Sequence, residues 1–469
     1  MELLGKKVCV VGLGASNLPV VRFLVKEGAR VTVCDQKDAE ALGKRYREVA
    51  DLPVRLNLGG RYLDVLMDED YDLVFLTPGM KKHLPEIEAA RARGAEIWSE
   101  MKLFFHLCPA LIAGITGTSG KTTTTTLVGE MLRASGLKTL VGGNIGRPLI
   151  EKVREIPASA RVVLELSSFQ LQLLDRSPQV GALLNISPNH LDIHRSMEEY
   201  VQAKANIWRF QGPGDAIVLN WDRPITREMA ASCRGKVFFF SYREEVSPGA
   251  FVRDGRIVVQ VDRKHEGEVE ICSTDEIRLP GAHNVENVMA ASILALLCGA
   301  EPGAIRRVAT TFRGVEHRLE LVANIGGVRY YNDSIATTPD RTEAALTTFT
   351  APVILIAGGY DKHIGFDDLA RTIRTRVKTL ITLGVTAPKI EKAVLDAVEV
   401  DGKERDLKIQ RVDSLEEAVR LAFQGARPGD VVLLSPACAS YDMFRNFEER
   451  GQQFRRLVEA LKKENQSVW

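Results

Sequence analysis

The sequence predicts an α/β protein with three domains. The chain has 469 residues, and about 150 residues per domain would give three. Short β-branched runs alternate with helical patterns at both ends of the chain, which indicates βαβ units around parallel sheets. The middle changes from this alternation to short strands with a hairpin signal. We therefore expect Rossmann-like first and third domains, and a P-loop ATPase-like central domain with a parallel sheet plus a smaller antiparallel sheet.

The first domain is expected over residues 1–106. Its predicted elements are a helix at 18–26, a short helix capped by Ser99, and strands at 7–11, 30–34, 71–76 and 95–98.

The central domain is expected over residues 107–314. Strands are predicted at 111–116, 162–166 and 182–186, with helices at 197–210 and 284–297. Asp254-Gly255 lies between two alternating runs, and this dipeptide favours a two-residue hairpin turn.

The third domain is expected over residues 315–469. Its alternating pattern predicts strands at 328–331, 353–357, 379–383 and 431–435 and a last helix at 443–462.

Composition excludes several classes of protein. Lys plus Arg number 62 and Asp plus Glu 61, a net charge of +1, which argues against nucleic-acid binding through bulk charge. No apolar run approaches the ~20 residues that span a bilayer, and the start of the chain has no secretory signal pattern. The seven dispersed cysteines are typical of small buried residues in a reducing compartment. We therefore expect a cytoplasmic protein.

The strongest motif follows the strand at 111–116. Gly117, Gly120, Lys121 and Thr122 resemble a phosphate-binding loop between a strand and a helix. Glycines let backbone N–H groups surround an anion, the lysine can bridge phosphates, and the threonine hydroxyl can bind Mg²⁺. Ile115 replaces the first glycine of the strict pattern, so the loop is a variant; an incidental glycine-rich turn is the less favoured alternative.

Polar residues follow two further strands of the central domain. Glu165 ends an apolar strand, where a carboxylate can hold a metal beside the phosphates. His190 lies in the loop after the next strand, and its position alone does not separate a surface residue from a site residue. Lys204 lies in a helical stretch, where composition alone favours a solvated lysine.

The first glycine-rich turn, Gly12 to Asn17, is a weaker signal. Asn17 stands where the dinucleotide fingerprint has its third glycine. Asp35 can bind a ribose hydroxyl at the end of the next strand. A nicotinamide or flavin site is less favoured than binding of another nucleotide by the same backbone amides.

Polar loops also follow strands of the third domain. They lie at 332–334, 358–362 and 435–440, and Arg318 near the domain boundary can bind a phosphate or carboxylate. Such loops converge at one edge of a parallel sheet.

Together these motifs resemble the Mur ligases, ATP-dependent amide-bond-forming enzymes of peptidoglycan precursor synthesis. The matching segments are the Gly12 and Gly117 loops, residues 143–146, 165–170, 189–192 and 314–318, and the run SPACASYDMFRNF at 435–447. The last segment is similar to the branch that adds D-glutamate to UDP-N-acetylmuramoyl-L-alanine. Ile335 stands where the family often has lysine.

The resemblance implies a role for each domain. The first would bind the UDP part of the nucleotide substrate, the central one ATP, and the third would bring D-glutamate and close over the site. It implies two Mg²⁺ ions, a carbamylated Lys204, no nucleic-acid or membrane partner, and a monomer.

The resemblance also implies a role for each site residue. The ATP residues are Gly117, Thr118, Ser119, Gly120, Lys121, Thr122, Thr123, Asn284, Asn287, Arg318 and Asp333. The UDP-substrate residues are Gly14, Ala15, Ser16, Asp35, Thr77, Pro78, Gly79, Asn144, Ser167 and His190. The D-glutamate residues are Thr337, Lys362, Ser440 and Phe447. The metal residues are Thr122, Glu165, His190 and carbamylated Lys204, and the catalytic residues are Lys121, His190 and Lys204.

Other activities remain as alternatives. A folylpolyglutamate synthase-like enzyme or another Mur-branch ligase would share the phosphate loop and the acyl-phosphate chemistry. A nicotinamide-dependent oxidoreductase leaves Lys121 unexplained, and a non-catalytic nucleotide switch leaves the third-domain loops unexplained.

Overall fold

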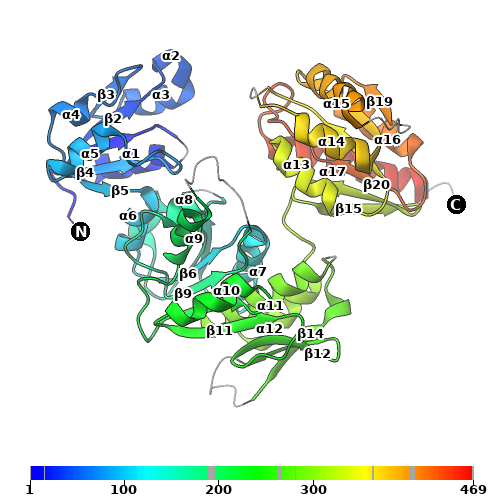
Figure 1. Cartoon of the computed structure of the whole chain (residues 1–469), viewed down its shortest axis with the longest axis horizontal. Helices are drawn as coiled ribbons and strands as arrows, with labels where there is room; N and C mark the ends of the chain where they lie inside the picture. Colours follow the sequence, from blue (N-terminus) through cyan, green and yellow to red (C-terminus); the bar gives the residue numbers. More distant parts are fainter. Residues whose placement is uncertain are drawn as a thin grey trace. The chain divides into compact units, whose positions relative to one another are not determined.

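The computed structural model describes residues 2–14, 16–146, 148–187, 196–260, 267–279, 281–361, 364–401 and 407–466. The chain divides into two compact units, Met1–Phe312 and Arg313–Trp469. Each unit has its own sheets and cores, and Figure 1 labels many of their helices and strands. The division at residues 106 and 107 stays a prediction.

The first unit begins with a five-stranded parallel sheet in the order β3-β2-β1-β4-β5. This is the strand order of a Rossmann-like half-sheet with its flanking strands. The strands are β1 (Lys7–Val11), β2 (Arg30–Asp35), β3 (Val54–Leu58), β4 (Leu73–Leu76) and β5 (Glu96–Trp98). The helices are α1 (Asn17–Lys26), α2 (Ala39–Leu42), α3 (Lys44–Ala50), α4 (Val65–Asp68), α5 (Pro85–Ala92) and α6 (Glu100–Leu107).

The second sheet of this unit has nine strands in the order β14-β13-β12-β11-β10-β9-β6-β8-β7. The strands are β6 (Leu111–Thr116), β7 (Thr139–Gly143), β8 (Arg161–Glu165), β9 (Val180–Leu183), β10 (Ala216–Asn220), β11 (Lys236–Ser241), β12 (Gly249–Arg253), β13 (Arg256–Gln260) and β14 (Val269–Ser273). The helices are α7 (Lys121–Ala134), α8 (Ser168–Leu171), α9 (Met197–Ala205), α10 (Pro224–Met229), α11 (Ala282–Leu297) and α12 (Pro302–Thr311), with 3-10 turns η1 (Ile150–Glu155), η2 (Ala230–Ser232) and η3 (Thr274–Glu276).

The antiparallel strands differ from the expectation in one respect. β12, β13 and β14 form the predicted antiparallel group, but β12 is also paired in parallel with β11. The expected smaller sheet is therefore the edge of the large one, visible at the lower end of the first unit in Figure 1. The Asp254-Gly255 turn is confirmed, with φ of 47° and 73°, because a tight hairpin needs positive φ at both positions.

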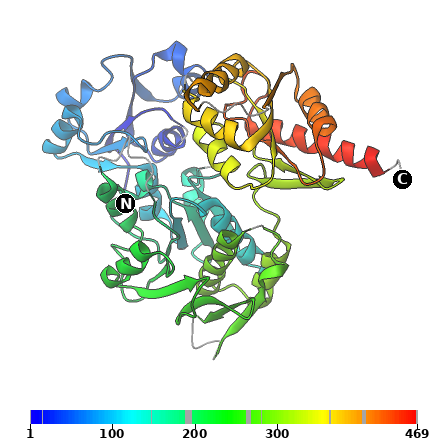
Figure 2. The ribbon, with the colours of Figure 1, turned by 45° about the vertical axis from the view of Figure 1, so that its right-hand side comes forward.

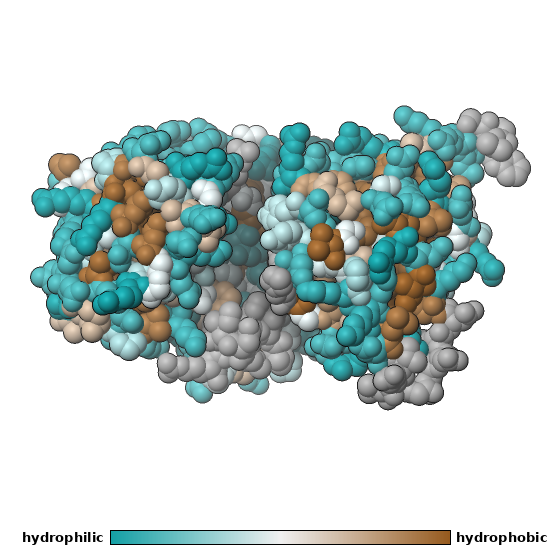
Figure 3. All heavy atoms as spheres, turned by 90° about the horizontal axis from the view of Figure 1, so that it is seen from above, coloured by the Kyte–Doolittle hydropathy of each residue, from teal (hydrophilic) through white to brown (hydrophobic). Residues whose placement is uncertain are grey.

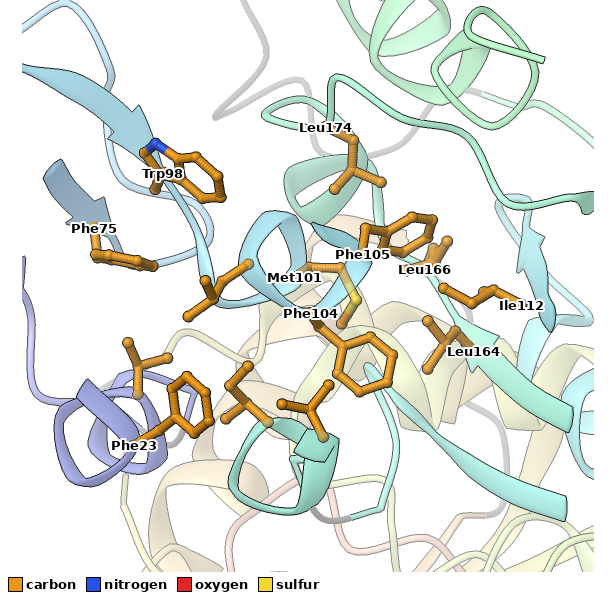
Figure 4. Packing of buried hydrophobic residues seen from close by; sticks show 14 of the residues in the cluster. Phe23, Phe75, Trp98, Met101, Phe104, Phe105, Ile112, Leu164, Leu166 and Leu174 are labelled. Atoms are coloured by element: carbon orange, nitrogen blue, oxygen red, sulfur yellow. The ribbon is translucent and has the colours of Figure 1, made fainter. Parts of the chain in front are cut away.

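One hydrophobic core joins the two sheets of the first unit. Met101, Phe104 and Phe105 of α6 pack in the same cluster as residues of both sheets. Figure 4 shows α6 between Phe75 and Trp98 on one side and Ile112 and Leu164 on the other. Ser99 caps this helix as expected, since its side chain accepts a hydrogen bond from the Lys102 N–H at 3.1 Å. The loops of both sheets are therefore carried on one packed body.

The second unit has a six-stranded sheet in the order β15-β16-β20-β17-β18-β19. The strands are β15 (Glu320–Ile325), β16 (Val328–Asn332), β17 (Val353–Ala357), β18 (Val377–Thr382), β19 (Lys408–Arg411) and β20 (Val431–Leu434). The helices are α13 (Pro339–Thr347), α14 (Asp367–Arg376), α15 (Ala387–Asp401), α16 (Leu415–Gly425) and α17 (Phe447–Gln466). Only β15 is antiparallel to its neighbour in this sheet.

Alternate residues of β17 enter two cores on opposite faces of this sheet. Val353 and Leu355 belong to one cluster, and Ile354 and Ile356 to the other. The long helix α17, drawn in red in Figure 2, packs on β15 and β16. A strand covered on both faces has a continuous apolar sequence, which is why β17 was predictable without alternation.

The surface and the helices agree with the composition. On the face shown in Figure 3, hydrophilic residues surround small apolar groups. No helix in the described part of the chain has both the length and the apolar character needed to cross a membrane. All seven cysteines are described and free, and five of them are buried.

Candidate active site

The loop between β6 and α7 has the geometry of a phosphate-binding loop. Gly120 precedes the helix with φ of 81°, and Gly117 has φ of 154°. A Cβ on Gly120 would lie 2.5 Å from Asn287 Oδ1, so only glycine fits both the backbone and the space. The first backbone N–H groups of α7 have no carbonyl partner within the helix, which makes this end of the helix a site for an anion.

Lys121 folds back over the loop. Its Nζ donates hydrogen bonds to the carbonyl oxygens of Gly117 and Thr118, each at 2.9 Å. The ammonium group therefore lies beside the loop backbone, where phosphates of a bound nucleotide would carry their negative charge. Thr118 is half-buried and Ser119 is exposed on the same loop.

Asn185 holds this loop, and the sequence analysis did not single it out. Its Oδ1 accepts hydrogen bonds from the backbone N–H groups of Thr118 at 3.1 Å and Ser119 at 2.9 Å. Its Nδ2 donates to Ser119 O at 3.2 Å. The sequence analysis placed Asn185 inside the strand predicted at 182–186, whereas β9 ends at Leu183 and leaves Asn185 in the loop that follows.

Thr122 and Glu165 form the oxygen-rich side of the site. Thr122 Oγ1 donates to Glu165 Oε2 at 2.7 Å, and Asn144 Nδ2 donates to Glu165 Oε1 at 2.9 Å. Glu165 is 2% exposed. A hydroxyl and a carboxylate are ligands that Mg²⁺ prefers, so these residues fit the ion. Among the described residues, no group of three or more His, Cys, Asp or Glu side chains could hold a metal.

Lys204 is buried beside the phosphate loop, contrary to the solvated lysine that composition favours. It is 1% exposed, and its Nζ donates to Thr116 Oγ1 at 3.2 Å and Gly117 O at 3.0 Å. Burial lowers the pKa of Lys204 well below its ordinary value; the charge of Lys121 lowers this pKa further, and Glu165 opposes both.

Tyr200 supports Lys204 from one turn earlier in α9. The ammonium lies 4.7 Å from the centroid of the Tyr200 ring, which is a cation–π contact. The Tyr200 hydroxyl is 3.2 Å from Thr118 Oγ1. Sequence reasoning missed this residue, although its spacing of four from Lys204 places both on one helix face. His190, the other predicted metal ligand, lies outside the described residues.

The two asparagines predicted near adenine or ribose lie at the same loop. Asn287 Oδ1 accepts a hydrogen bond from Thr124 Oγ1 at 3.3 Å, and Asn287 Nδ2 donates to Asn284 Oδ1 at 3.1 Å. The structure thus brings the start of α11 to the start of α7. Thr123 is half-buried in the first turn of α7.

The predicted UDP residues of the first sheet lie in loops at the ends of β1, β2 and β4. Asp35 accepts hydrogen bonds from Leu13 N at 2.6 Å and Lys37 N at 2.9 Å. Thr77 Oγ1 donates to Val11 O at 2.9 Å. The half-buried members of the set are Gly14, Ser16, Asp35, Thr77, Pro78 and Gly79; Ala15 lies outside the described residues.

The remaining residues of that set belong to the second sheet's loops. Ser167 follows β8, and its hydroxyl accepts a hydrogen bond from Gln170 N at 3.2 Å and caps α8. Asn144 follows β7 and is hydrogen-bonded to Glu165, and His190 lies outside the described residues.

The second unit has its own polar cluster, centred on Asp333 after β16. Ser435 Oγ donates to Asp333 Oδ2 at 2.7 Å, and Leu319 N donates to Oδ1 at 3.1 Å. Burial raises the pKa of Asp333 to about 7, although these hydrogen bonds and the charges of Arg318 and Arg341 lower it. Arg318 itself is exposed. Arg341 Nη1 also donates to Ile335 O at 3.2 Å, so a cation stands beside the position where lysine is common.

Arg450 of α17 connects this cluster to the loop after β20, and sequence reasoning missed it too. Its guanidinium donates to Ser334 Oγ at 3.0 Å and to the carbonyl oxygens of Ser334 at 2.9 Å and Cys438 at 3.1 Å. Arg450 is 2% exposed, and burial lowers its pKa to about 10. Its position three residues after Phe447, the last residue of the segment that carried the resemblance, was the available signal.

Two of the predicted D-glutamate residues belong to this part of the chain: Ser440 lies in the loop after β20, and Phe447 begins α17, which follows it. Ser440 is buried in the loop after β20, and its carbonyl oxygen accepts a hydrogen bond from Phe444 N at 2.8 Å. Thr337 and Phe447 are half-buried, and the Phe447 carbonyl accepts a hydrogen bond from Ser334 Oγ at 2.8 Å. Lys362 lies outside the described residues.

Three family models match the chain in order. They are the MurD-like N-terminal domain of Mur ligases over residues 6–99, the Mur ligase middle domain over 115–295 and the Mur ligase glutamate ligase domain over 317–438.

Curated relatives match nearly the whole chain. A UDP-N-acetylmuramoylalanine–D-glutamate ligase of Symbiobacterium thermophilum is 54% identical over 462 residues, covering 98% of this chain and 99% of the relative. A protein of the same name from Acetivibrio thermocellus is 49% identical over 460 residues, covering 98% of this chain and 97% of the relative.

Solved structures share the fold at low identity. The UDP-N-acetylmuramate-alanine ligase MurC of Thermotoga maritima has a TM-score of 0.53 at 19% identity, covering 97% of this chain and 100% of that one. A murein peptide ligase of Psychrobacter arcticus has a TM-score of 0.51 at 17% identity, covering 98% and 99%. With full-length relatives at this identity and three matching domain models in order, the chain belongs to the Mur ligase family.

Proposed function

We propose that this ligase joins D-glutamate to UDP-N-acetylmuramoyl-L-alanine, using ATP, in the synthesis of peptidoglycan precursors. The observation that carries the proposal is the 54% identity to a full-length relative named for this reaction. The loop after β6, with its lysine and adjacent carboxylate, supplies the phosphate chemistry that such a ligase needs.

In the proposed reaction, the L-alanine carboxylate attacks the γ-phosphorus of ATP and ADP leaves. The D-glutamate nitrogen then attacks the acyl phosphate, a proton is lost from that nitrogen, and phosphate leaves as the amide forms. Lys121 stabilises the charge on the transferred phosphoryl group, because its ammonium lies over the loop that faces the phosphates. No protein nucleophile is needed in either step.

The proposal includes two Mg²⁺ ions. Thr122 and Glu165 would hold one, and His190 with a carbamate on Lys204 would hold the other. When bound, the ions neutralise phosphate charge. The buried Lys204 amine, with its lowered pKa, favours carbamate formation because only the neutral amine reacts with CO₂.

The remaining assignments follow the same division of labour. Asn284, Asn287, Arg318 and Asp333 would contact the adenosine or phosphates, and the loops at the ends of β1, β2 and β4, with Asn144, Ser167 and His190, would bind the UDP substrate. Thr337, Lys362, Ser440 and Phe447 would bind D-glutamate. We expect a cytoplasmic monomer that binds neither nucleic acid nor membrane.

A substrate panel tests the proposal. L-Ala, D-Glu, L-Lys and meso-diaminopimelate are each supplied with the matching UDP precursor, and ADP and phosphate are measured. We expect turnover only with UDP-N-acetylmuramoyl-L-alanine and D-glutamate together. Release of AMP and pyrophosphate, or turnover with a folate substrate and glutamate, would contradict the proposal.

A further inference from the structure

Asn17 places a buried amide at the start of α1. The side chain is 0% exposed. Its Nδ2 lies 3.0 Å from Val11 O, 3.0 Å from Gly12 O and 3.1 Å from Thr77 Oγ1. Since an amide has two N–H groups, the three acceptors share them. One side chain therefore connects the end of β1 to the loop after β4.

The two loops that Asn17 connects also touch each other directly. Gly12 has φ of +86°, and a Cβ there would lie 2.2 Å from Thr77 Oγ1. Thr77 Oγ1 donates to Val11 O at 2.9 Å and leaves its lone pairs available to Asn17. Thr77 N donates to Val11 O at 3.2 Å. The two loops are thus hydrogen-bonded to each other at the carboxyl edge of the sheet, where ligands bind in such folds.

Retaining this amide has a cost for folding. Asn17 Oδ1 is buried and has no hydrogen-bond partner in the described part of the chain. A buried acceptor without a partner destabilises the folded state. In the dinucleotide fingerprint, glycine at this position allows close packing of helix and strand. The acceptor of this amide has no partner in the described residues, whereas its donors reach both loops, so the donors are its useful feature.

We infer that Asn17 is a positioning residue for the uridine nucleotide substrate. Its amide fixes the Gly12 and Thr77 loops in one arrangement. The binding surface for the nucleotide is therefore preformed, and fewer backbone degrees of freedom are lost on binding. This inference rests on the proposed function, which assigns both loops to the UDP part of the substrate.

The test uses full-length enzyme and four variants. Asn17→Ala removes both donors, and the near-isosteric Asn17→Asp turns them into acceptors facing two carbonyl oxygens. Thr77→Val removes the shared hydroxyl, whereas Thr77→Ser keeps it. We expect KM for UDP-N-acetylmuramoyl-L-alanine to rise about tenfold in Asn17→Ala and further in Asn17→Asp, with KM for ATP and D-glutamate and kcat within about twofold. KM for the UDP substrate should rise more in Thr77→Val than in Thr77→Ser, because only serine keeps the hydroxyl that accepts a hydrogen bond from Asn17.

A matched control separates positioning from general destabilisation. Gln211 is also buried, donates to two carbonyl oxygens, Pro178 O at 2.9 Å and Ala216 O at 2.8 Å, and has a buried Oε1 without a partner in the described residues. Gln211→Ala should lower the melting temperature while leaving all three KM values unchanged. Equal rises of the three KM values in Asn17→Ala, or an unchanged KM for the UDP substrate, would overturn the inference.

Calorimetric titration with UDP keeps this inference separate from the proposed function. If wild-type enzyme fails to turn over the UDP precursor with D-glutamate, the proposed function is wrong. The titration still tests Asn17, because weaker UDP binding by Asn17→Ala than by the wild type supports the positioning role. Equal UDP affinity of the two proteins contradicts it.

Discussion

Lys204 and Asp333 are buried ionisable side chains beside the loops that follow the parallel strands of their units, and the two have opposite charge types. Lys204 is 1% exposed next to the phosphate loop, and Asp333 is 4% exposed next to the loop after β20. Burial moves both toward neutrality, since it lowers the pKa of the amine and raises that of the carboxyl group to about 7.

The neighbours of the two groups differ in kind. Lys204 has a second cation, Lys121, acting on it in the same direction as burial, and only Glu165 opposes them. Asp333 has two hydrogen-bond donors and two arginines beside it, and all four lower the pKa that burial raises. Lys121 therefore adds to the effect of burial on the pKa of Lys204, whereas the neighbours of Asp333 all act against it and leave this carboxyl group close to half-protonated at neutral pH. The same desolvation lowers the pKa of an amine in one unit and raises the pKa of a carboxyl group in the other.

Removing the second cation should have the largest effect. Lys121→Ala deletes the ammonium over the phosphate loop, so we expect kcat/KM for ATP to fall about a thousandfold or more, because charge stabilisation in a water-poor site is lost. The melting temperature should change little, since Lys121 is half-buried at the start of α7. ADP release measures activity, and the exposed Lys138→Ala serves as a control with full activity. Substantial ligase activity in Lys121→Ala would mean that the ATP site is misplaced.

Deleting the buried amine should have the next largest effect. Lys204→Ala should lose about a hundredfold in kcat, and added formate or acetate should restore part of it if a carbamate is the working group. The same carboxylates should leave Lys121→Ala unchanged, because that variant lacks an ammonium rather than an anion. No rescue in Lys204→Ala, together with wild-type activity that does not depend on dissolved bicarbonate, would count against the carbamate.

Much of the fold was predictable because its central strands are continuous apolar runs. The strands at residues 7–11, 111–116 and 353–357 coincide with β1, β6 and β17. The edge strand β3 was missed, although its alternation of apolar residues with Arg55 and Asn57 is the pattern of a half-buried strand. The pairing of β12 with β11 could not be predicted from the sequence either. Hairpin signals identify local strand pairing, but they do not show which sheet the hairpin extends.

The candidate site was predictable where the residues that carry the chemistry belong to the same short motif that determines the backbone structure. Lys121 and Thr122 belong to a local pattern that fixes both loop and helix. Lys204 and Asn185 depend on how distant segments pack, and a helix lysine looks solvated until the strand beside it is known. The environment of Asp333 depends likewise on Ser435, which lies 102 residues away in the sequence.

The carboxyl group of the second unit should have the smallest effect, visible as a pH dependence of stability. The folded-state pKa of Asp333 is about 7, above its ordinary value, so the folded protein binds this proton more tightly than the unfolded chain does. Its contribution to stability is therefore present at low pH and declines as pH rises toward 7, by at most about 1.4 kcal/mol per pH unit. The side chain introduced by Asp333→Asn has no proton to lose in this range. The free energy of unfolding of Asp333→Asn should therefore increase relative to that of the wild type between pH 5 and pH 7, and the difference should be constant above pH 8.

Urea unfolding of the full-length protein across this range measures the difference, with the exposed Asp340→Asn as the control that follows the wild type throughout. A difference between Asp333→Asn and the wild type that stays constant from pH 5 to pH 8 would show that the carboxyl group does not titrate there, and that burial does not act on the acid of one unit as it acts on the amine of the other.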